Sequence, residues 1–184
     1  VDFSQLAASI EFVRLVPDQP NEISGLTVTP HLQLHSGDSY GFRFEKDGKR
    51  VVYSTDSEHK LENRAEAESF AAFFRDADVV IFDAMYALAD AISVKADWGH
   101  SSNIVGVELC QMARAKHLVL FHHEPANDDA TLEGLLKEAR RFEELRRDAQ
   151  LTGRLTAGAE VGDDQDEAPP LRCEASEREQ VVVR

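Results

Sequence analysis

The stretch Phe42–Asp56, FRFEKDGKRVVYSTD, decides the fold because it holds two strands and the turn between them. Apolar and polar residues alternate on both sides of Asp47-Gly48. An Asp-Gly pair between two alternating runs is a strong signal for a β-hairpin with a tight turn. The second run, Val51–Thr55, ends directly before Asp56. The stretch therefore predicts a hairpin that brings a carboxylate to the end of a strand.

Strand and helix patterns continue on both sides of this hairpin. Runs that alternate between apolar and polar residues are typical of strands, whereas apolar residues recurring every three or four positions are typical of helices. The expected elements are strands at Ile10–Leu15, Leu26–Leu34, Val79–Asp83 and Leu118–Phe121, and helices over 62–76, 103–114 and from 129 onward. This order predicts an α/β fold, a mixed sheet with helices on its outer face.

Length and composition are those of one globular domain. The chain has 184 residues, of which 42% are hydrophobic and 29% are charged, as in ordinary globular proteins. We expect a domain over residues 1–160 and an acidic disordered tail over 161–184, where no apolar period is present. No run approaches the roughly 20 apolar residues that span a bilayer, so we expect no membrane partner. The two cysteines and the lack of a visible leader fit the cytoplasm.

The charge balance limits the choice of partners. Thirty-four acidic and 20 basic residues give a formal net charge of −14. Long nucleic acids are bound mainly through cationic surfaces, so we expect none as a partner. A small anionic substrate remains compatible with this charge, because bound metal ions supply local positive charge.

Four residues stand where strands end or a helix begins: His35, Asp56, His100 and His122. Side chains at strand ends gather at one edge of a sheet, which is where α/β folds carry their sites. Three imidazoles and a carboxylate at one edge suit zinc or manganese. The set predicts half of a two-metal hydrolase centre.

Three further residues are weaker candidates. Asp83 ends a strand, and we expect it either to orient a histidine through a hydrogen bond or to cap a loop. His123 should point away from the site that His122 faces, because adjacent strand residues alternate in direction. His59 follows Asp56 closely in a loop; it could touch the site, but we expect it to be exposed to solvent.

The motifs around these residues resemble those of the metallo-β-lactamase fold family. Its nearest branch in this respect is the phosphodiesterase group with the phosphonate-pathway cyclic phosphodiesterase and ribonuclease Z-like proteins. The matching motifs are Leu34–Gly41, Tyr53–Asp56, Trp98–Ser101 and Leu118–His122. The resemblance covers about residues 3–160 and implies the C-terminal half of an αββα fold.

The resemblance also implies roles for individual residues. His35 would ligate one metal ion, His122 would ligate the other, and Asp56 would bridge both. His100 would be the catalytic or phosphate-stabilising histidine, while the role of Asp83 is less fixed. The complete site would bind two zinc ions, with manganese as the alternative, and would hydrolyse a small phosphodiester.

The family's leading signature, His-x-His-x-Asp-His, is absent, since no two histidines here are separated by one residue. That signature supplies four ligands, and a zinc ion usually takes about four donors. We therefore expect this chain alone to be inactive, with the N-terminal half on another polypeptide or truncated away.

A half-sandwich would also expose one apolar sheet face, which would pair with the missing half or lead to self-association. The alternative to an enzyme part is a non-catalytic binding or regulatory module that keeps the fold without a working metal centre.

Overall fold

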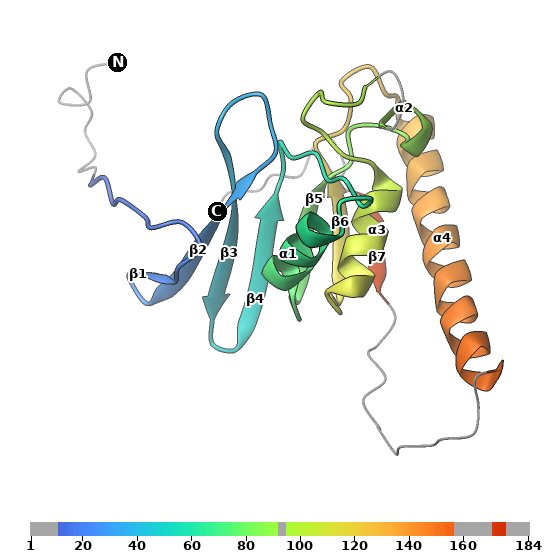
Figure 1. Ribbon diagram of the computed structural model, residues 1–184. Helices are drawn as coiled ribbons and strands as arrows, with labels where there is room; N and C mark the ends of the chain where they lie inside the picture. The colour runs from blue at the N-terminus through green and yellow to red at the C-terminus, as the bar shows by residue number, and fades with distance from the viewer. Residues whose placement is uncertain (1–10, 92–94, 157–170, 176–184) are drawn as a thin grey trace.

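The computed structural model describes residues 11–91, 95–156 and 171–175. Within them, the strands form one seven-stranded sheet whose spatial order follows the chain (Figure 1). The strands are β1 (Asn21–Ile23), β2 (Leu26–Gln33), β3 (Ser39–Lys46), β4 (Lys49–Ser54), β5 (Val79–Asp83), β6 (His117–Phe121) and β7 (Arg172–Ala175). The helices are α1 (Arg64–Phe74), α2 (Leu88–Ala91), α3 (Asn103–Met112) and α4 (Asp129–Thr156).

The sheet is mixed, as the sequence predicts. Strands β1 to β4 pair antiparallel, and β4 to β7 pair parallel. The hairpin between β3 and β4 turns at Asp47 and Gly48, whose φ angles are 50° and 72°. Two successive residues with positive φ are what the tight hairpin turn requires. The predicted hairpin is confirmed.

The helices cover one face of the sheet and form the core with it (Figure 1). Alternate residues of the central strands point into this core, among them Val52, Phe82 and Leu120, which are completely buried. Ser102 caps the N-terminus of α3, because its hydroxyl oxygen accepts a hydrogen bond from the Val105 N–H at 3.3 Å. Burial of such side chains, each stabilising by about 1.5–3 kcal/mol, holds helices and sheet together.

The opposite face of the sheet also carries apolar side chains. Cross-strand register places them on one side, since Phe42 pairs with Tyr53, Tyr53 with Ile81, and Ile81 with Val119. Tyr53 is 37% exposed and Leu32, in β2, is 50% exposed. In the part of the chain that the structure describes, no helix covers this face.

Some elements differ from the sequence prediction. The disordered tail expected over 161–184 is wrong for residues 172–175, which form β7 beside β6. Cys173 in this strand is buried, and the Arg140 guanidinium donates to its carbonyl oxygen at 3.2 Å. This strand is therefore held by long-range contacts rather than by a local period. The other residues of 161–184 lie outside the described residues, and the domain boundary at residue 160 stays a prediction.

Three shorter differences remain. Residues 11–15, expected as part of a strand, form no strand in the structure. The three-residue strand β1 and the four-residue helix α2 have no clear signal in the sequence.

No helix among the described residues has both the length and the apolar character needed to cross a membrane.

Two glycines inside helices test how tightly α3 packs on the sheet. A Cβ added at Gly106 in α3 would lie 2.8 Å from the Phe82 ring, whereas one at Gly134 in α4 meets nothing within 4 Å. We predict that Gly106→Ala lowers the free energy of unfolding by about 1–3 kcal/mol through overpacking. Gly134→Ala should raise it by about 0.5–1 kcal/mol, because alanine favours the helix. Urea unfolding of both variants checks this, and equal effects would contradict the packing.

Candidate metal centre

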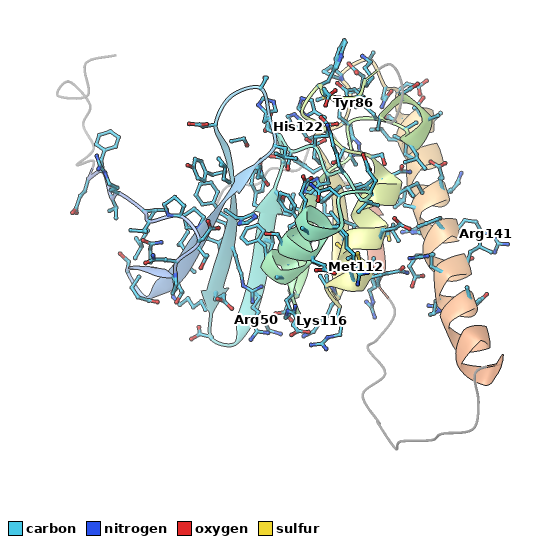
Figure 2. The ribbon with its side chains drawn as sticks, viewed as in Figure 1. Arg50, Tyr86, Met112, Lys116, His122 and Arg141 are labelled. Atoms are coloured by element: carbon cyan, nitrogen blue, oxygen red, sulfur yellow. The ribbon has the colours of Figure 1, made fainter. Side chains whose placement is uncertain are left out.

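Four strands end at the same edge of the sheet. Strands β4, β5 and β6 are parallel, and β2 runs in their direction because it is antiparallel to β3, which is antiparallel to β4. Their C-terminal ends lead to His35, Asp56, Asp83 and His122. Figure 2 shows His122 and Tyr86 at this end of the sheet, with Arg50 and Lys116 at the opposite end.

The structure brings two histidines to one carboxylate oxygen. Nε2 of His35 lies 3.9 Å from Oδ1 of Asp56, and Nε2 of His122 lies 3.4 Å from the same oxygen. Donors around one tetrahedral zinc ion, with bonds of about 2.0–2.2 Å, lie roughly 3.3–3.6 Å apart. The three side chains are partly exposed. The separation of His122 from Asp56 lies within this range, and that of His35 lies a few tenths of an ångström beyond it.

Two of these residues have an unusual backbone conformation. The φ angles of Asp56 and His122 are 56° and 55°, in the left-handed region. Such a conformation costs a non-glycine residue about 1–3 kcal/mol, although aspartate tolerates it better than most. Asp56 lies two positions after the end of β4, and His122 directly follows the end of β6. This conformation ends the extended backbone and turns each side chain in a direction that a continued strand would not give it.

His100 lies beside the same group and is oriented by Asp83. Its Nδ1 donates a hydrogen bond to Oδ2 of Asp83 at 2.8 Å. Its ring lies 5.3 Å from that of His35 and 5.1 Å from that of His122, between centroids. The hydrogen bond to Asp83 raises the pKa of His100, while partial burial works in the opposite direction. Since Nδ1 is engaged, Nε2 is the atom left for chemistry.

Asp83 itself is completely buried and makes four hydrogen bonds. Besides His100, its carboxylate accepts from the backbone N–H groups of Met85 at 3.2 Å, and of Ser57 and Ser101 at 3.3 Å. A buried carboxylate needs such partners, because its loss of hydration is costly. The two roles expected for Asp83, orienting a histidine and capping loops, are thus combined in one side chain.

Among the residues that the structure describes, two groups of side chains have a spacing that suits a metal ion: His35, Asp56 and His100 form one, and Asp83, His100 and His122 form the other. The ligand atoms of each group lie within 4.8 Å of one another. His35, Asp56 and His122 do not form such a group, because their ligand atoms do not all lie within 4.8 Å of one another. Each of the two histidines is therefore close to Asp56 but not to the other histidine. In the second group, Asp83 is already hydrogen-bonded on both oxygens. The carboxylate of the first group, Asp56, is therefore more available to a metal ion than the carboxylate of the second.

His59 is not exposed, so that expectation is wrong. Its side chain is buried, with 6% of the residue accessible, and its ring packs between Phe70 and Phe82. Hydrogen bonds to Ser57 and Ser101 satisfy both ring nitrogens and so permit this burial. Burial lowers the pKa of His59 to about 3, so the ring is neutral at physiological pH. Nothing in the sequence around His59 signals these long-range partners.

His123 makes a different contact from its neighbour His122. Its Nδ1 lies 3.3 Å from the carbonyl oxygen of Ala84. It belongs to neither group with metal-like spacing.

Sequence reasoning missed two residues that hold the site loops together. The Glu58 carboxylate accepts from the backbone N–H groups of Asp97 at 3.0 Å and Gly99 at 3.2 Å. Gly99 has a φ of +84°, and a Cβ there would lie 2.6 Å from Cδ2 of His35. The glycine inside the Trp98–Ser101 motif was the available signal, since only glycine allows this close approach.

A lysine near the site was also missed. The Lys95 ammonium lies 4.2 Å from the ring centroid of Trp98 and 5.1 Å from that of Tyr86. The Tyr86 ring in turn meets His100 edge-on, with centroids 5.9 Å apart. Glu124 lies 3.9 Å from the same ammonium. Cation–π contacts of this kind hold a positive charge in place, here on the His100 side of the centre.

A family model described as the beta-lactamase superfamily domain matches residues 2–123. No curated protein matches the chain significantly.

Among solved structures, the chain is similar to the metallo-beta-lactamase fold protein YhfI from Bacillus subtilis, with 25% identity and a TM-score of 0.59. The match covers 71% of this chain and 48% of YhfI, so the chain spans about half of that protein's length. The short form of human tRNase Z shares 21% identity over 56% of this chain and 39% of its own, with a TM-score of 0.46. A diphosphatase of the PhnP family shares 22% over 66% and 42%, also at 0.46.

The packing of Gly99 on His35 gives a prediction for the site. Gly99→Ala should lower the free energy of unfolding by about 1–3 kcal/mol, because alanine is strained at positive φ. It should also weaken Zn²⁺ binding, because the new methyl group displaces the His35 ring. Gly37→Ala, in the loop that carries His35, is the matched control, since nothing lies within 4 Å of an added Cβ there. Zn²⁺ competition with a chromophoric chelator checks this, and an unchanged affinity in Gly99→Ala would remove His35 from the ligand set.

Proposed function

This chain belongs to the beta-lactamase superfamily, whose domain model it matches over residues 2–123, and we propose that it supplies part of the metal centre of a hydrolase that cleaves a phosphodiester. The observation that carries the proposal is the approach of His35 and His122 to the same oxygen of Asp56, at 3.9 and 3.4 Å. A carboxylate between two imidazoles can bridge two cations. The proposed centre is therefore dinuclear, with one histidine on each side.

The proposed ligands have distinct tasks. His35 would hold one ion, His122 the other, and Asp56 would place negative charge between them. Zinc suits these donors best, with manganese as the alternative. When bound, the ions would polarise the phosphate oxygens and lower the pKa of a water molecule.

His100 is the proposed acid in this reaction. Because Asp83 fixes Nδ1, the ring can turn only Nε2 toward a substrate. From there it would bind a phosphate oxygen or give a proton to the leaving oxygen. The Asp83 carboxylate, buried and fully hydrogen-bonded, keeps the ring in one orientation and stabilises its charged form.

Two electrostatic features support a small anionic substrate. Lys95 keeps a positive charge on the His100 side of the centre, although Glu124 offsets part of it. Positive groups fixed beside a reacting phosphate stabilise the charge that develops there. The net charge of −14 disfavours a long polyanion, which needs an extended cationic surface. A short phosphodiester agrees with both features.

The proposal includes a second half of the fold. The chain spans 48% of YhfI, and the described residues leave one apolar sheet face uncovered. Three proposed ligands are also fewer than two zinc ions require. We infer that the remaining ligands lie on an N-terminal half, in the same polypeptide or a partner, that packs on this face.

The roles of Asp56 and His100 give a prediction for a protein that joins this chain to such a half. Asp56→Ala should lose metal, because two cations would then face each other without the carboxylate between them. His100→Ala should keep metal and lose about 10²- to 10⁴-fold in turnover, as removal of an acid–base group does. Metal content and hydrolysis of bis-p-nitrophenyl phosphate are the measurements.

The control is Asp38→Ala, an exposed aspartate in the His35 loop, which should change neither measurement. The 184-residue chain alone should show no tight binding of two ions and no turnover. Loss of metal in His100→Ala would make His100 a ligand instead, as its spacing from His35 and Asp56 allows. A joined protein without metal or turnover would favour a non-catalytic binding module.

The uncovered face gives a separate prediction for the chain alone. Apolar patches of this extent usually find a partner, so the chain should self-associate with rising concentration despite its negative charge. Leu32→Lys on this face should weaken association. Met112→Lys, at a position equally exposed on α3, should not. Sedimentation velocity measures this, and a monomeric wild-type chain at high concentration would contradict the open face.

A further inference from the structure

His59 connects the sheet to two loops of the candidate centre. Its ring lies 4.3 Å from that of Phe70 in α1 and 4.9 Å from that of Phe82 in β5, between centroids. Such a place suits an apolar side chain of similar size. A histidine here must satisfy two polar nitrogens without water, which is costly unless both are hydrogen-bonded. Its hydrogen bonds therefore call for a reason beyond packing.

Both ring nitrogens contact serine hydroxyls. Nδ1 lies 2.8 Å from Oγ of Ser101, and Nε2 lies 3.3 Å from Oγ of Ser57. The Ser101 hydroxyl also donates to the carbonyl oxygen of Ser57 at 2.9 Å. Because a hydroxyl has one proton, a Ser101 that donates to Ser57 accepts from His59. The Ser57 hydroxyl lies 3.5 Å from the carbonyl oxygen of Glu58 and 3.3 Å from Nε2 of His59, and we assign its proton to the shorter contact. This assignment places the proton of His59 on Nδ1 and leaves Nε2 as an acceptor from Ser57.

The two serines have matching places in the centre. Ser57 directly follows Asp56, and Ser101 directly follows His100. Each also donates its backbone N–H to a different oxygen of Asp83, at 3.3 Å. His59 and Asp83 thus bind the same two serines. His59 contacts their hydroxyl groups, and Asp83 accepts hydrogen bonds from their backbone N–H groups.

We propose that His59 is a positioning residue that sets the separation between the Asp56 loop and the His100 loop. A shift of Ser101 relative to Ser57 would break hydrogen bonds to both His59 and Asp83. The orientation of His100, which depends on Asp83, would then be lost. The inference rests on the proposed function only for the roles of Asp56 and His100, since the hydrogen bonds are present without metal or substrate.

Variants of His59 can separate its packing from its hydrogen bonds. His59, Ser101 and His100 line a cavity of about 300 Å³. His59→Leu keeps an apolar side chain between the phenylalanines but removes both hydrogen bonds. His59→Asn keeps a donor near the position of Nδ1. Phe70→Leu is the matched control, because it disturbs the packing of the ring but not its hydrogen bonds.

The experiment is ¹⁵N NMR of the histidine rings in the full 184-residue chain without metal. In the wild type, we expect His59 to carry its proton on Nδ1 and to stay neutral between about pH 5 and 8, in keeping with its pKa of about 3. The Nδ1 proton of His100, held by Asp83, should exchange slowly with solvent. A His59 protonated on Nε2 would overturn the proposal.

The variants separate positioning from packing. His59→Leu should speed exchange of the His100 Nδ1 proton at least roughly tenfold, by opening the loops locally. His59→Asn should restore slow exchange, and Phe70→Leu should lower the melting temperature without speeding it. Unchanged exchange in His59→Leu, or equal acceleration in Phe70→Leu, would overturn the proposal. These exchange measurements do not depend on hydrolase activity. Failure of the proposed function and failure of the positioning role of His59 are therefore distinguishable.

Discussion

The buried carboxylate of Asp83 is the constraint on which the candidate centre depends. A charge removed from water must be compensated by hydrogen bonds or it destabilises the fold by several kcal/mol. Here the compensation comes from three backbone N–H groups and one imidazole. These donors belong to the loops after β4 and β5 and to the segment before α3. Folding of β5 therefore fixes the relative positions of segments far apart in the sequence.

The direction of the strands explains why the candidate ligands meet. Parallel pairing of β4, β5 and β6 sets their C-terminal ends in one row, and the hairpins bring the end of β2 to the same edge. The left-handed backbone of Asp56 and His122 then turns both side chains toward the centre of the row. The interactions of the rest of the fold offset the free-energy cost of this conformation, as is usual at functional sites.

Local signals predicted most of the fold and singled out four residues, His35, Asp56, His100 and His122, that the structure brings close together. The Asp47-Gly48 turn, the apolar strands and the Ser102 cap depend on interactions within a few residues, and the sequence contains them in full. Strand β7 could not be predicted, because four polar-flanked residues become a strand only through pairing with β6. The burial of His59 was missed for the same reason: its partner Ser101 is 42 positions away. Side chains that join distant segments leave no period in the sequence.

The position of His100 limits what the described residues can bind. Its ring belongs to both groups with metal-like spacing, yet Nδ1 is committed to Asp83 at 2.8 Å. One remaining nitrogen cannot serve the His35 side and the His122 side of Asp56 together. If His100 acts on substrate, each side keeps one histidine and a share of one carboxylate, which is well short of the four donors of a zinc ion. The need for ligands from another half of the fold thus follows from the hydrogen bond that orients His100.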